Sequence, residues 1–289
     1  MKITHIINPV KVNKASDLFL AQPVTFRTML KAKNDSKYKN QINQYVVGFE
    51  EDYEIFPLDF ITLPNLRTSV LDTNTFEKQR KLPLISEILY SLKDIDADYI
   101  IYTNVDIAVL PFFYDYIFSK IEKGSDSLII NRRVVGEIDE DATMFAVIGE
   151  SHPGYDCFVF RKELLNQFVF GNICIGANFI GRAMYANLIT FSDKLEIIKN
   201  VHVTFHIGDD GAWLANDYSE FDLHNKKEVI NLITQLIKCC KTIEIKEQLV
   251  ELIDFVNEYG VVKIDSKSKS KKSLPIIRKL KKIVKIIID

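Results

Sequence analysis

An amide and a carboxylate stand two positions apart, at Asn104 and Asp106, within the stretch ADYIIYTNVDIAVLP at 97–111. The apolar and aromatic run Tyr99–Tyr102 just before them is typical of a strand buried on both faces. Acidic side chains at the carboxyl end of such a strand occupy the usual ligand position of an open α/β sheet. A hard cation such as Mg²⁺ is typically held by one or two carboxylates and by substrate phosphates. The alternative is a turn that caps the next helix, because Asn and Asp often bond their own backbone.

A second polar stretch, VHVTFHIGDDGAW at 201–213, follows about a hundred residues later. His202 and His206 alternate with apolar residues, which predicts a half-buried strand with both histidines on one face. At ~3.3 Å per residue they are roughly 13 Å apart and cannot bind one metal ion. Imidazole binds Mn²⁺ acceptably beside carboxylates, so one of the two is a candidate ligand, and His206 is the one that lies against the turn 208–211. A lone strand histidine is more often structural.

These two segments resemble motifs of glycosyltransferases with the GT-A fold. Residues 103–106 resemble the acidic D-x-D-type motif, in which a strand end holds a divalent metal that binds the diphosphate of a nucleotide-sugar. Asn104 here replaces the first acid of that motif. The spacing of His206, Gly208 and Trp213 is similar to the late histidine motif that completes the metal site. The resemblance implies Mn²⁺ or Mg²⁺ on Asp106 and His206, with a nucleotide-sugar as donor substrate.

The resemblance also implies residues that bind the donor. Arg80 and Lys81 stand where basic residues pair with the donor diphosphate, at the start of an expected helix whose N-terminus suits an anion. The alternative is an ordinary solvated basic pair. Asn8, at the end of the first expected strand, and Asn104 complete the expected donor site.

A later segment, HPGYDCFVFR at 152–161, resembles the G-x-D-x-F-x-F-type segment of the acceptor pocket. The resemblance implies that Asp156 takes the proton from the attacking hydroxyl, directly or through one water. The alternative for Asp156 is turn chemistry beside a glycine. Asp209 is the second catalytic candidate, which would steady the ligand or bind the acceptor. Asn178 and Arg182 could face the sugar pocket.

Strands and helices alternate through Gly124, which predicts a parallel sheet of crossover units. The expected fold class is therefore α/β, and the resemblance implies a Rossmann-like GT-A fold with a mostly parallel sheet flanked by helices. The expected strands are 4–9, 44–49, 68–70, 99–102, 127–130, 157–161 and 202–207; the expected helices are 16–32, 76–92, 111–124 and 176–188. A capping-box pattern, Asn225 to Glu228, predicts the start of a C-terminal helical hairpin.

This pattern predicts three parts. Residues 1–220 form the GT-A catalytic domain, with a nucleotide-sugar-binding half at 1–130 and an acceptor half at 131–220. Residues 221–260 form the helical hairpin packed on it. Residues 261–289 form a basic linker and a membrane-surface helix. A literal D-x-D at Asp94, Asp96 and Asp98 precedes the strand 99–102 and is expected to be a solvated turn.

The net charge of −2 for 289 residues hides a strong asymmetry. From Val261 onward ten Lys/Arg face two Asp, a charge of +8 that leaves the body at −10. An acidic body argues against nucleic-acid binding. A polybasic linker before a short amphipathic helix, within 266–289, predicts attachment to an anionic membrane surface. The alternative is a helix that docks on a partner or on the body.

The four cysteines include no C-x-x-C pair, so the sequence predicts reduced thiols rather than a zinc site or a disulfide framework. Strand-like sequence begins directly after Met1-Lys2, without the apolar run of a signal peptide. The expected location is the cytoplasm, at the inner face of the cell membrane. The expected activity is sugar transfer to a glycan or lipid-linked glycan in bacterial capsule or lipopolysaccharide synthesis.

Two other functions remain open at this point. A nucleotidyltransferase has a related sheet and uses the metal similarly, but normally carries a Gly-rich basic loop after its first strand. The residues after the first strand here are Asn8-Pro9-Val10, which provide no such loop. A non-catalytic membrane-bound scaffold would keep the basic tail but would not need Asp106 and His206.

Overall fold

The computed structural model describes residues 1–136, 141–208 and 219–258. They fall within one compact unit, Met1–Tyr259. Among these residues, no helix combines the length and the apolar character needed to span a bilayer. The predicted tail, 261–289, lies outside the described residues.

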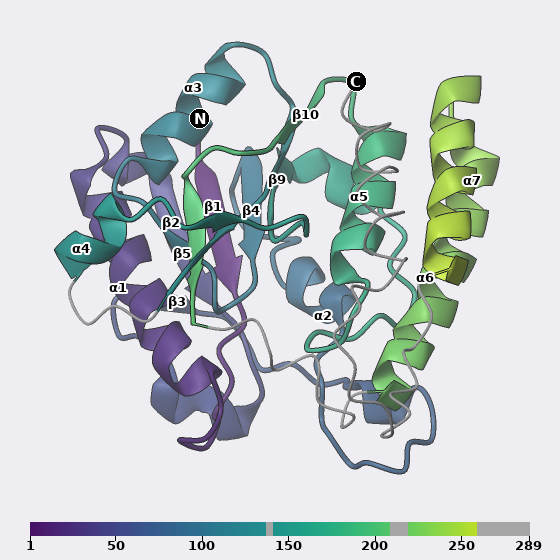
Figure 1. Cartoon of the computed structure of the whole chain (residues 1–289), viewed down its shortest axis with the longest axis horizontal. Helices are drawn as coiled ribbons and strands as arrows, with labels where there is room; N and C mark the ends of the chain where they lie inside the picture. The colour runs from purple at the N-terminus through teal and green to yellow at the C-terminus, as the bar shows by residue number, and fades with distance from the viewer. Residues whose placement is uncertain (137–140, 209–218, 259–289) are drawn as a thin grey trace, which may run out of the picture. The chain divides into compact units, whose positions relative to one another are not determined.

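A seven-stranded sheet forms the centre of the fold, in the order β10-β6-β9-β4-β1-β2-β3 (Figure 1). Its strands are β1 (Ile3–Ile7), β2 (Ile42–Val46), β3 (Ile61–Thr62), β4 (Tyr99–Thr103), β6 (Ser127–Ile130), β9 (Cys157–Arg161) and β10 (Leu195–Ile198). Every neighbouring pair is parallel except those of β9, which runs antiparallel to β4 and β6. The mostly parallel α/β sheet expected from the sequence is confirmed.

Helices cover both faces of this sheet (Figure 1). Helices α1 (Leu18–Asp35) and α3 (Phe113–Glu122) pack on one face, and α2 (Ile85–Tyr90), α5 (Ile180–Phe191), α6 (Ser219–Cys239) and α7 (Ile243–Glu258) pack on the other. Every residue of β4 is buried, as the apolar run before Asn104 predicts for a strand enclosed on both faces.

A smaller sheet has the order β5-β11-β7-β8. Its strands are β5 (Ala108–Val109), β7 (Arg133–Val135), β8 (Glu150–Ser151) and β11 (Thr204–Ile207), with the short helix α4 (Asp141–Ala146) between β7 and β8. Strand β11 pairs antiparallel with β5 and parallel with β7. This sheet therefore joins the segments that follow β4 and β6 to the late strand that carries His206.

Two expectations between residues 68 and 92 are wrong. Residues Val70–Asp72 form a short 3₁₀ turn instead of a strand, and the third strand of the sheet is β3. The expected helix at 76–92 begins only at Ile85, after Pro83. Proline disfavours a helical conformation in the residue before it, so the helix cannot extend back through Leu82. Arg80 and Lys81 consequently lie in a loop and not at a helix start.

The expected capping box at Asn225 is also wrong. Helix α6 begins six residues earlier, at Ser219, and Asn225 is buried within it. The Asn225 side chain bonds the backbone of Cys174 instead, and Glu228 accepts a hydrogen bond from the Asn172 amide. Both polar residues of the pattern thus hold a neighbouring loop in place.

Candidate active site

Polar side chains gather at one edge of the central sheet, where β1, β2, β4 and β6 end and β9 begins. Strand β2 lies on one side of β1 and β4 on the other, so the chain diverges at this point. Open α/β sheets bind ligands in the crevice outside the carboxyl ends at such a point. Beyond the pairs that Cys157 makes with Thr103 and Ile130, the same register sets Asp156 between the strand ends of β4 and β6.

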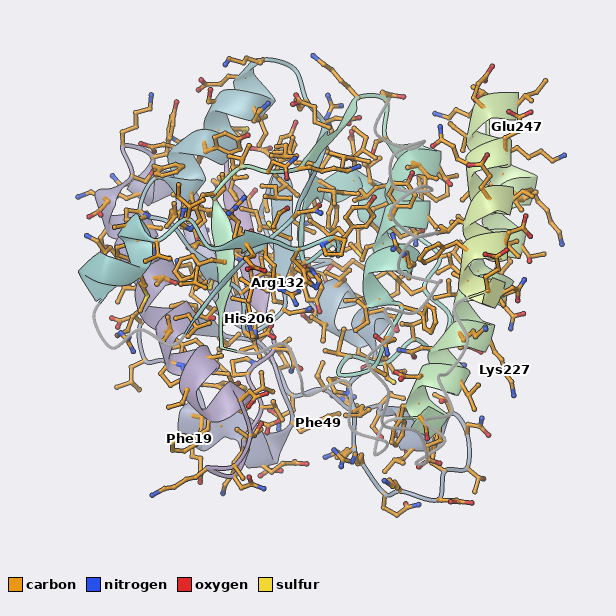
Figure 2. The ribbon with its side chains drawn as sticks, viewed as in Figure 1. Phe19, Phe49, Arg132, His206, Lys227 and Glu247 are labelled. Carbon is orange, nitrogen blue, oxygen red and sulfur yellow. The ribbon has the colours of Figure 1, made fainter. Side chains whose placement is uncertain are left out.

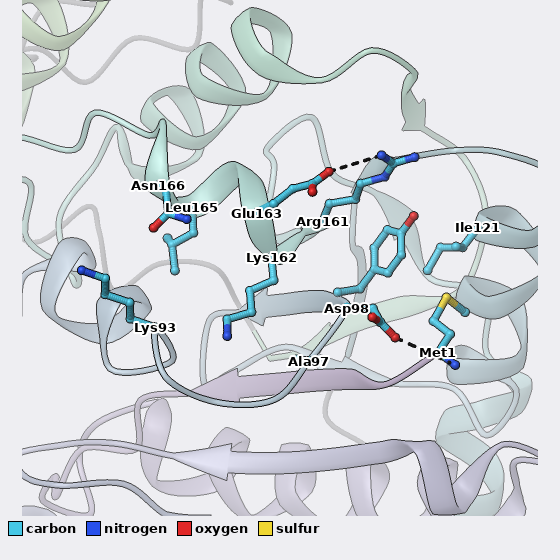
Figure 3. A pocket seen from close by; sticks show the side chains of 11 residues that line it. Met1, Lys93, Ala97, Asp98, Ile121, Arg161, Lys162, Glu163, Leu165 and Asn166 are labelled. Atoms are coloured by element: carbon cyan, nitrogen blue, oxygen red, sulfur yellow. Dashed lines mark hydrogen bonds and ion pairs between the residues drawn. The ribbon is translucent and has the colours of Figure 1, made fainter.

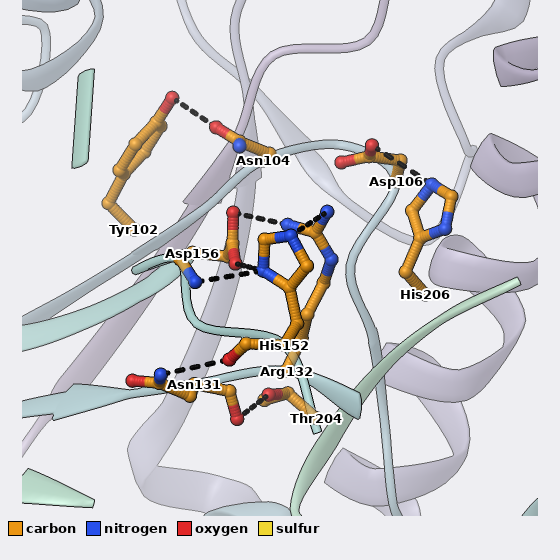
Figure 4. A network of polar contacts seen from close by, with 10 residues as sticks. Tyr102, Asn104, Asp106, Asn131, Arg132, His152, Asp156, Thr204 and His206 are labelled. Atoms are coloured by element: carbon orange, nitrogen blue, oxygen red, sulfur yellow. Dashed lines mark hydrogen bonds and ion pairs between the residues drawn. The ribbon is translucent and has the colours of Figure 1, made fainter. Parts of the chain in front are cut away.

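Asp106 and His206 meet at this edge although a hundred residues separate them (Figure 4). The pairing of Phe205 with Ala108 in β11 and β5 carries the late histidine to the segment just after β4. The His206 Nε2 atom lies 3.3 Å from Asp106 Oδ2, and the His206 residue is 4% exposed. The sequence-based prediction that these two side chains converge agrees with this geometry.

The Asp106 carboxylate is charged and only partly engaged. Burial raises its pKa, but the hydrogen bond and charge of His206 and the charge of Arg132 outweigh that rise, so the net shift is downward. Its Oδ1 atom is buried and has no hydrogen-bond partner in the part of the chain that the structure describes. A buried anionic oxygen without a donor is costly unless a ligand compensates it.

A carboxylate beside an imidazole is a donor set that Mn²⁺ or Mg²⁺ accepts. No cluster of three or more His, Cys, Asp or Glu side chains suited to a metal occurs within 1–136, 141–208 and 219–258. The pair Asp106 and His206 therefore fits an ion whose other ligands come from water and a substrate diphosphate. Asp209, the second catalytic candidate, lies outside the described residues.

Asn104 lies in the turn between β4 and β5. Its side-chain oxygen accepts a hydrogen bond of 3.1 Å from the Tyr102 hydroxyl. Burial, together with the charges of Asp106 and Asp156, raises the pKa of Tyr102, so the hydroxyl stays protonated as a donor. Helix α3 begins at Phe113 without a side-chain cap. The alternative that Asn104 and Asp106 cap this helix is therefore wrong.

A second charged pair, Arg132 and Asp156, lies beside the first (Figure 4). Arg132 Nη1 lies 2.5 Å from Asp156 Oδ1, and the residues are 6% and 7% exposed. The His152 Nδ1 atom lies 3.7 Å from Asp156 Oδ2 and accepts a hydrogen bond from the Gly154 amide. Burial raises the pKa of Asp156, Arg132 and His152 offset part of the rise, and the net shift is upward.

The sequence-based hypothesis did not include Arg132 or His152 among the site residues. Arg132 follows the strand 127–130 at its carboxyl end, the same position that singled out Asp106 after β4. Applying that rule to every expected strand would have found it. Figure 2 shows Arg132 and His206 at the middle of the fold, with Phe49 nearby in the view.

Two of the expected donor residues, Asn8 and Lys81, lie at the same edge. Asn8 follows β1, is buried, and donates a 2.7 Å hydrogen bond to the Val47 carbonyl just after β2. Lys81 lies against the end of β2, with its Nζ 2.8 Å from Glu51 Oε1 and 4.0 Å from the centre of the Phe49 ring. Arg80 precedes Lys81 in the same loop.

Asn178 and Arg182 are both engaged in packing. The Asn178 side-chain amide donates a 2.9 Å hydrogen bond to Asp222 on α6. The Arg182 guanidinium lies over the rings of Tyr155 and Phe255, at 5.3 and 4.6 Å from their centres. Arg182 therefore braces Tyr155, the residue before Asp156, against α7, and Asn178 joins the segment just before α5 to α6.

A hollow of about 790 Å³ opens at the opposite edge of the sheet, near the amino ends of β1 and β4 (Figure 3). Its two acids are paired, since Asp98 faces the N-terminal amine and Glu163 lies 3.3 Å from Arg161. Asp96, in the turn 94–98, pairs with Lys2 just before β1. The acidic run 94–98 is thus at the edge away from Asp106, as expected for a solvated turn.

Comparison with known proteins gives a structural match and no sequence match. No family model matches the chain, and no curated protein matches its sequence. The crystal structure of S. aureus TarS 1–349 superposes with a TM-score of 0.57 at 14% identity, covering 94% of this chain and 76% of that one. The chain has a GT-A-type fold.

Two further TarS structures match over the same region. The complex with UDP-GlcNAc gives a TM-score of 0.54 at 13% identity and covers 89% of this chain and 72% of that one. The complex with UDP gives 0.52 at 13% identity, covering 89% and 71%. At such identities the match establishes the shared fold, and the chemistry rests on the residues of this GT-A-type chain.

Proposed function

We propose that this chain is a glycosyltransferase that moves a sugar from a nucleotide-sugar donor to a hydroxyl acceptor, with a divalent metal at Asp106 and His206. The observation that carries the proposal is the meeting of these two side chains, 3.3 Å apart, at the ligand-binding edge of the sheet. The shared fold of TarS, whose structures contain UDP-GlcNAc and UDP, supports a nucleotide-sugar donor.

In this proposal the donor diphosphate lies across the ends of β4, β1 and β2. Asn8 and Asn104 line the crevice, and Arg80 and Lys81 supply positive charge from the neighbouring loop. Asp106 and His206 hold Mn²⁺ or Mg²⁺, which when bound supplies the charge that stabilises the leaving diphosphate. Asp156 accepts the proton of the attacking hydroxyl.

The acceptor in this proposal is a glycan or lipid-linked glycan of a bacterial surface polysaccharide, with Asp209 contributing to its binding. The support is the charge distribution, because a +8 tail behind an acidic body is attracted to anionic lipid. Residues 266–289 then hold the enzyme at the cytoplasmic face of the membrane, close to a lipid-linked acceptor.

Equilibrium binding of UDP, measured with and without Mn²⁺, tests the metal site. We expect Mn²⁺-dependent binding that weakens at least ~10-fold in Asp106→Asn and in His206→Gln, since even outer-shell changes reach that size. Asp96→Asn and His202→Gln are matched controls, an acid of the 94–98 turn and the other histidine of the late segment, and should bind like the wild type.

Equal binding in all five proteins would overturn the metal assignment. Binding of a nucleoside triphosphate with incorporation of its nucleotide would favour the nucleotidyltransferase. Absence of any nucleotide binding would favour the scaffold.

A further inference from the structure

We propose that Arg132 is a positioning residue for the transfer reaction, which fixes the Asp156 carboxylate so that one oxygen, Oδ2, is held ready to take a proton. This inference rests on the proposed function, because it assigns a role to the base of that reaction. It adds a residue that neither the sequence motifs nor the fold comparison indicates.

The two oxygens of Asp156 have different surroundings. Oδ1 lies 2.5 Å from Arg132 Nη1, in a charge-assisted contact. Oδ2 is buried and has no hydrogen-bond partner within the described residues, and its nearest ionic neighbour is His152 Nδ1 at 3.7 Å. The Arg132 contact therefore fixes the rotation of the carboxyl group and leaves Oδ2 as the oxygen that can accept a proton.

His152 does not compete strongly for that oxygen. Its Nδ1 atom is engaged by the Gly154 amide at 2.9 Å and lies 3.7 Å from Asp156 Oδ2, beyond hydrogen-bond distance. Its Nε2 atom lies 3.5 Å from Arg132 Nη2. The histidine thus packs beside the guanidinium and leaves the Asp156 Oδ2 lone pairs available.

The proton transfer in this step is balanced by the bonds that change. The acceptor hydroxyl oxygen forms a bond to the anomeric carbon of the donor sugar, and its proton moves to Asp156 Oδ2. The bond from the anomeric carbon to the diphosphate oxygen breaks, and its electron pair leaves on the diphosphate. Arg132 keeps its proton throughout and contributes by orientation and charge.

A purely structural role would also make Arg132 important, because removing one partner of a buried ion pair commonly costs 3–5 kcal/mol of stability. A double variant measures the structural part. In Arg132→Met with Asp156→Asn neither buried charge remains, so folding stability should recover relative to Arg132→Met alone. The positioning role is tested by turnover in Arg132→Met and Arg132→Lys, which both keep Asp156.

The experiment measures three quantities for wild type, Arg132→Met, Arg132→Lys, Asp156→Asn and the double variant. These are UDP affinity with Mn²⁺, the rate of UDP release from the best donor in a panel beginning with UDP-GlcNAc, and the unfolding midpoint. We expect Arg132→Met and the double variant to lose 10²-fold or more in kcat, the scale of general-base catalysis, with UDP affinity changed less than about threefold. Arg132→Lys should restore part of kcat, because lysine keeps the positive charge but lacks the planar guanidinium with its paired N–H donors.

Arg161→Met is the matched control, since Arg161 is the last residue of β9, at the edge of the sheet opposite Asp156, and is paired with Glu163. Its UDP affinity, rate of UDP release and unfolding midpoint should match those of the wild type. An unchanged kcat in Arg132→Met would overturn the inference while leaving the proposed function intact. A wild-type protein that binds no UDP and cleaves no nucleotide-sugar would overturn the proposed function itself, and the inference with it.

Discussion

Two buried histidines of this chain have different environments. His206 faces a carboxylate at the edge of the sheet, whereas His5 lies inside β1 between two hydroxyl groups. The His5 ring nitrogens lie 2.9 Å from the Tyr114 hydroxyl and 3.0 Å from the Thr103 hydroxyl. Burial lowers the pKa of His5 to about 3, so it stays neutral in the folded protein.

The low pKa of His5 in the folded chain predicts that the free energy of unfolding depends on pH. The unfolded chain protonates His5 near pH 6.5, but the folded chain does not until pH is near 3, so acidification favours unfolding between these values. The loss from this residue is up to about 1.4 kcal/mol per pH unit, or about 2 kcal/mol between pH 6.5 and 5. Urea unfolding at several pH values should show this slope in wild type and a shallower one in His5→Gln. Equal slopes in wild type and His5→Gln would contradict the role of His5.

At the residue scale the sequence predicted the site in part. Asp106 and His206 could be predicted because each stands next to a strand with a clear apolar pattern. The strand-end rule would have included Arg132 but not distinguished it from its neighbour Arg133, since an Arg-Arg pair in a sequence is usually solvated surface. Its burial depends on β9 inserting antiparallel beside β6, a long-range pairing that local patterns do not encode.

At the element scale, the position of Asp156 depends on α5. Gly181 lies in the first turn of that helix, and a Cβ atom there would come within 2.7 Å of the Tyr155 backbone oxygen. A backbone oxygen cannot rotate away as a side chain can. The close approach of α5 therefore fixes the residue that directly precedes Asp156.

Gly181→Ala should consequently displace this segment. We expect a loss of about 1–3 kcal/mol in stability, the cost of overpacking, with a lower rate of donor cleavage. Gly136→Ala is the matched control because no atom would lie within 4 Å of its new Cβ. Urea unfolding and UDP release should change little in that control. A Gly181→Ala protein as stable and active as Gly136→Ala would show that the approach is not required.

Helix α6 holds the loop after Phe170 through one buried amide. The Asn225 side chain bonds the Cys174 amide and carbonyl and the Asn178 carbonyl, each at 2.9 Å. Asn225→Ala should lower the unfolding free energy by about 2–3 kcal/mol, because several buried backbone groups lose their partner. Thr234→Ala, at an exposed position of the same helix, should stay within about 0.5 kcal/mol. Equal stability of the two variants would argue against this clamp.

Most helices and strands could be predicted because their apolar periods are strong. The predicted helix starts were wrong where a proline or a long-range contact determines the local structure. The period through Leu82, Ile85 and Leu89 suggested one long helix, but Pro83 divides it. The pattern at Asn225 suggested a helix start, but its amide bonds a loop 51 residues away. The first of these errors moved the expected place of Arg80 and Lys81 from a helix to a loop, and Lys81 still lies near the end of β2.

At the scale of the whole molecule, the described body and the basic tail have separate roles in the proposal. Figure 2 labels Lys227 on α6 and Glu247 on α7, two of the many charged side chains on the body. The body of this chain carries −10 and the segment after Gly260 carries +8. An anionic surface should therefore attract the tail and repel the body.

Vesicle sedimentation tests this separation. The full chain should pellet with vesicles that contain phosphatidylserine, and the fraction bound should fall as salt is raised. A chain that stops at Gly260 should remain in the supernatant, and neutral phosphatidylcholine vesicles should bind neither form. A truncated chain that still pellets would contradict the proposed anchor.

The most direct test of the metal site is a crystal structure of the chain with UDP and Mn²⁺, in which anomalous scattering locates the metal. The account predicts one Mn²⁺ within about 2.5 Å of an Asp106 oxygen and of His206 Nε2, with the diphosphate completing its shell. Manganese at the 94–98 turn, or UDP in the hollow at the opposite edge of the sheet, would contradict it.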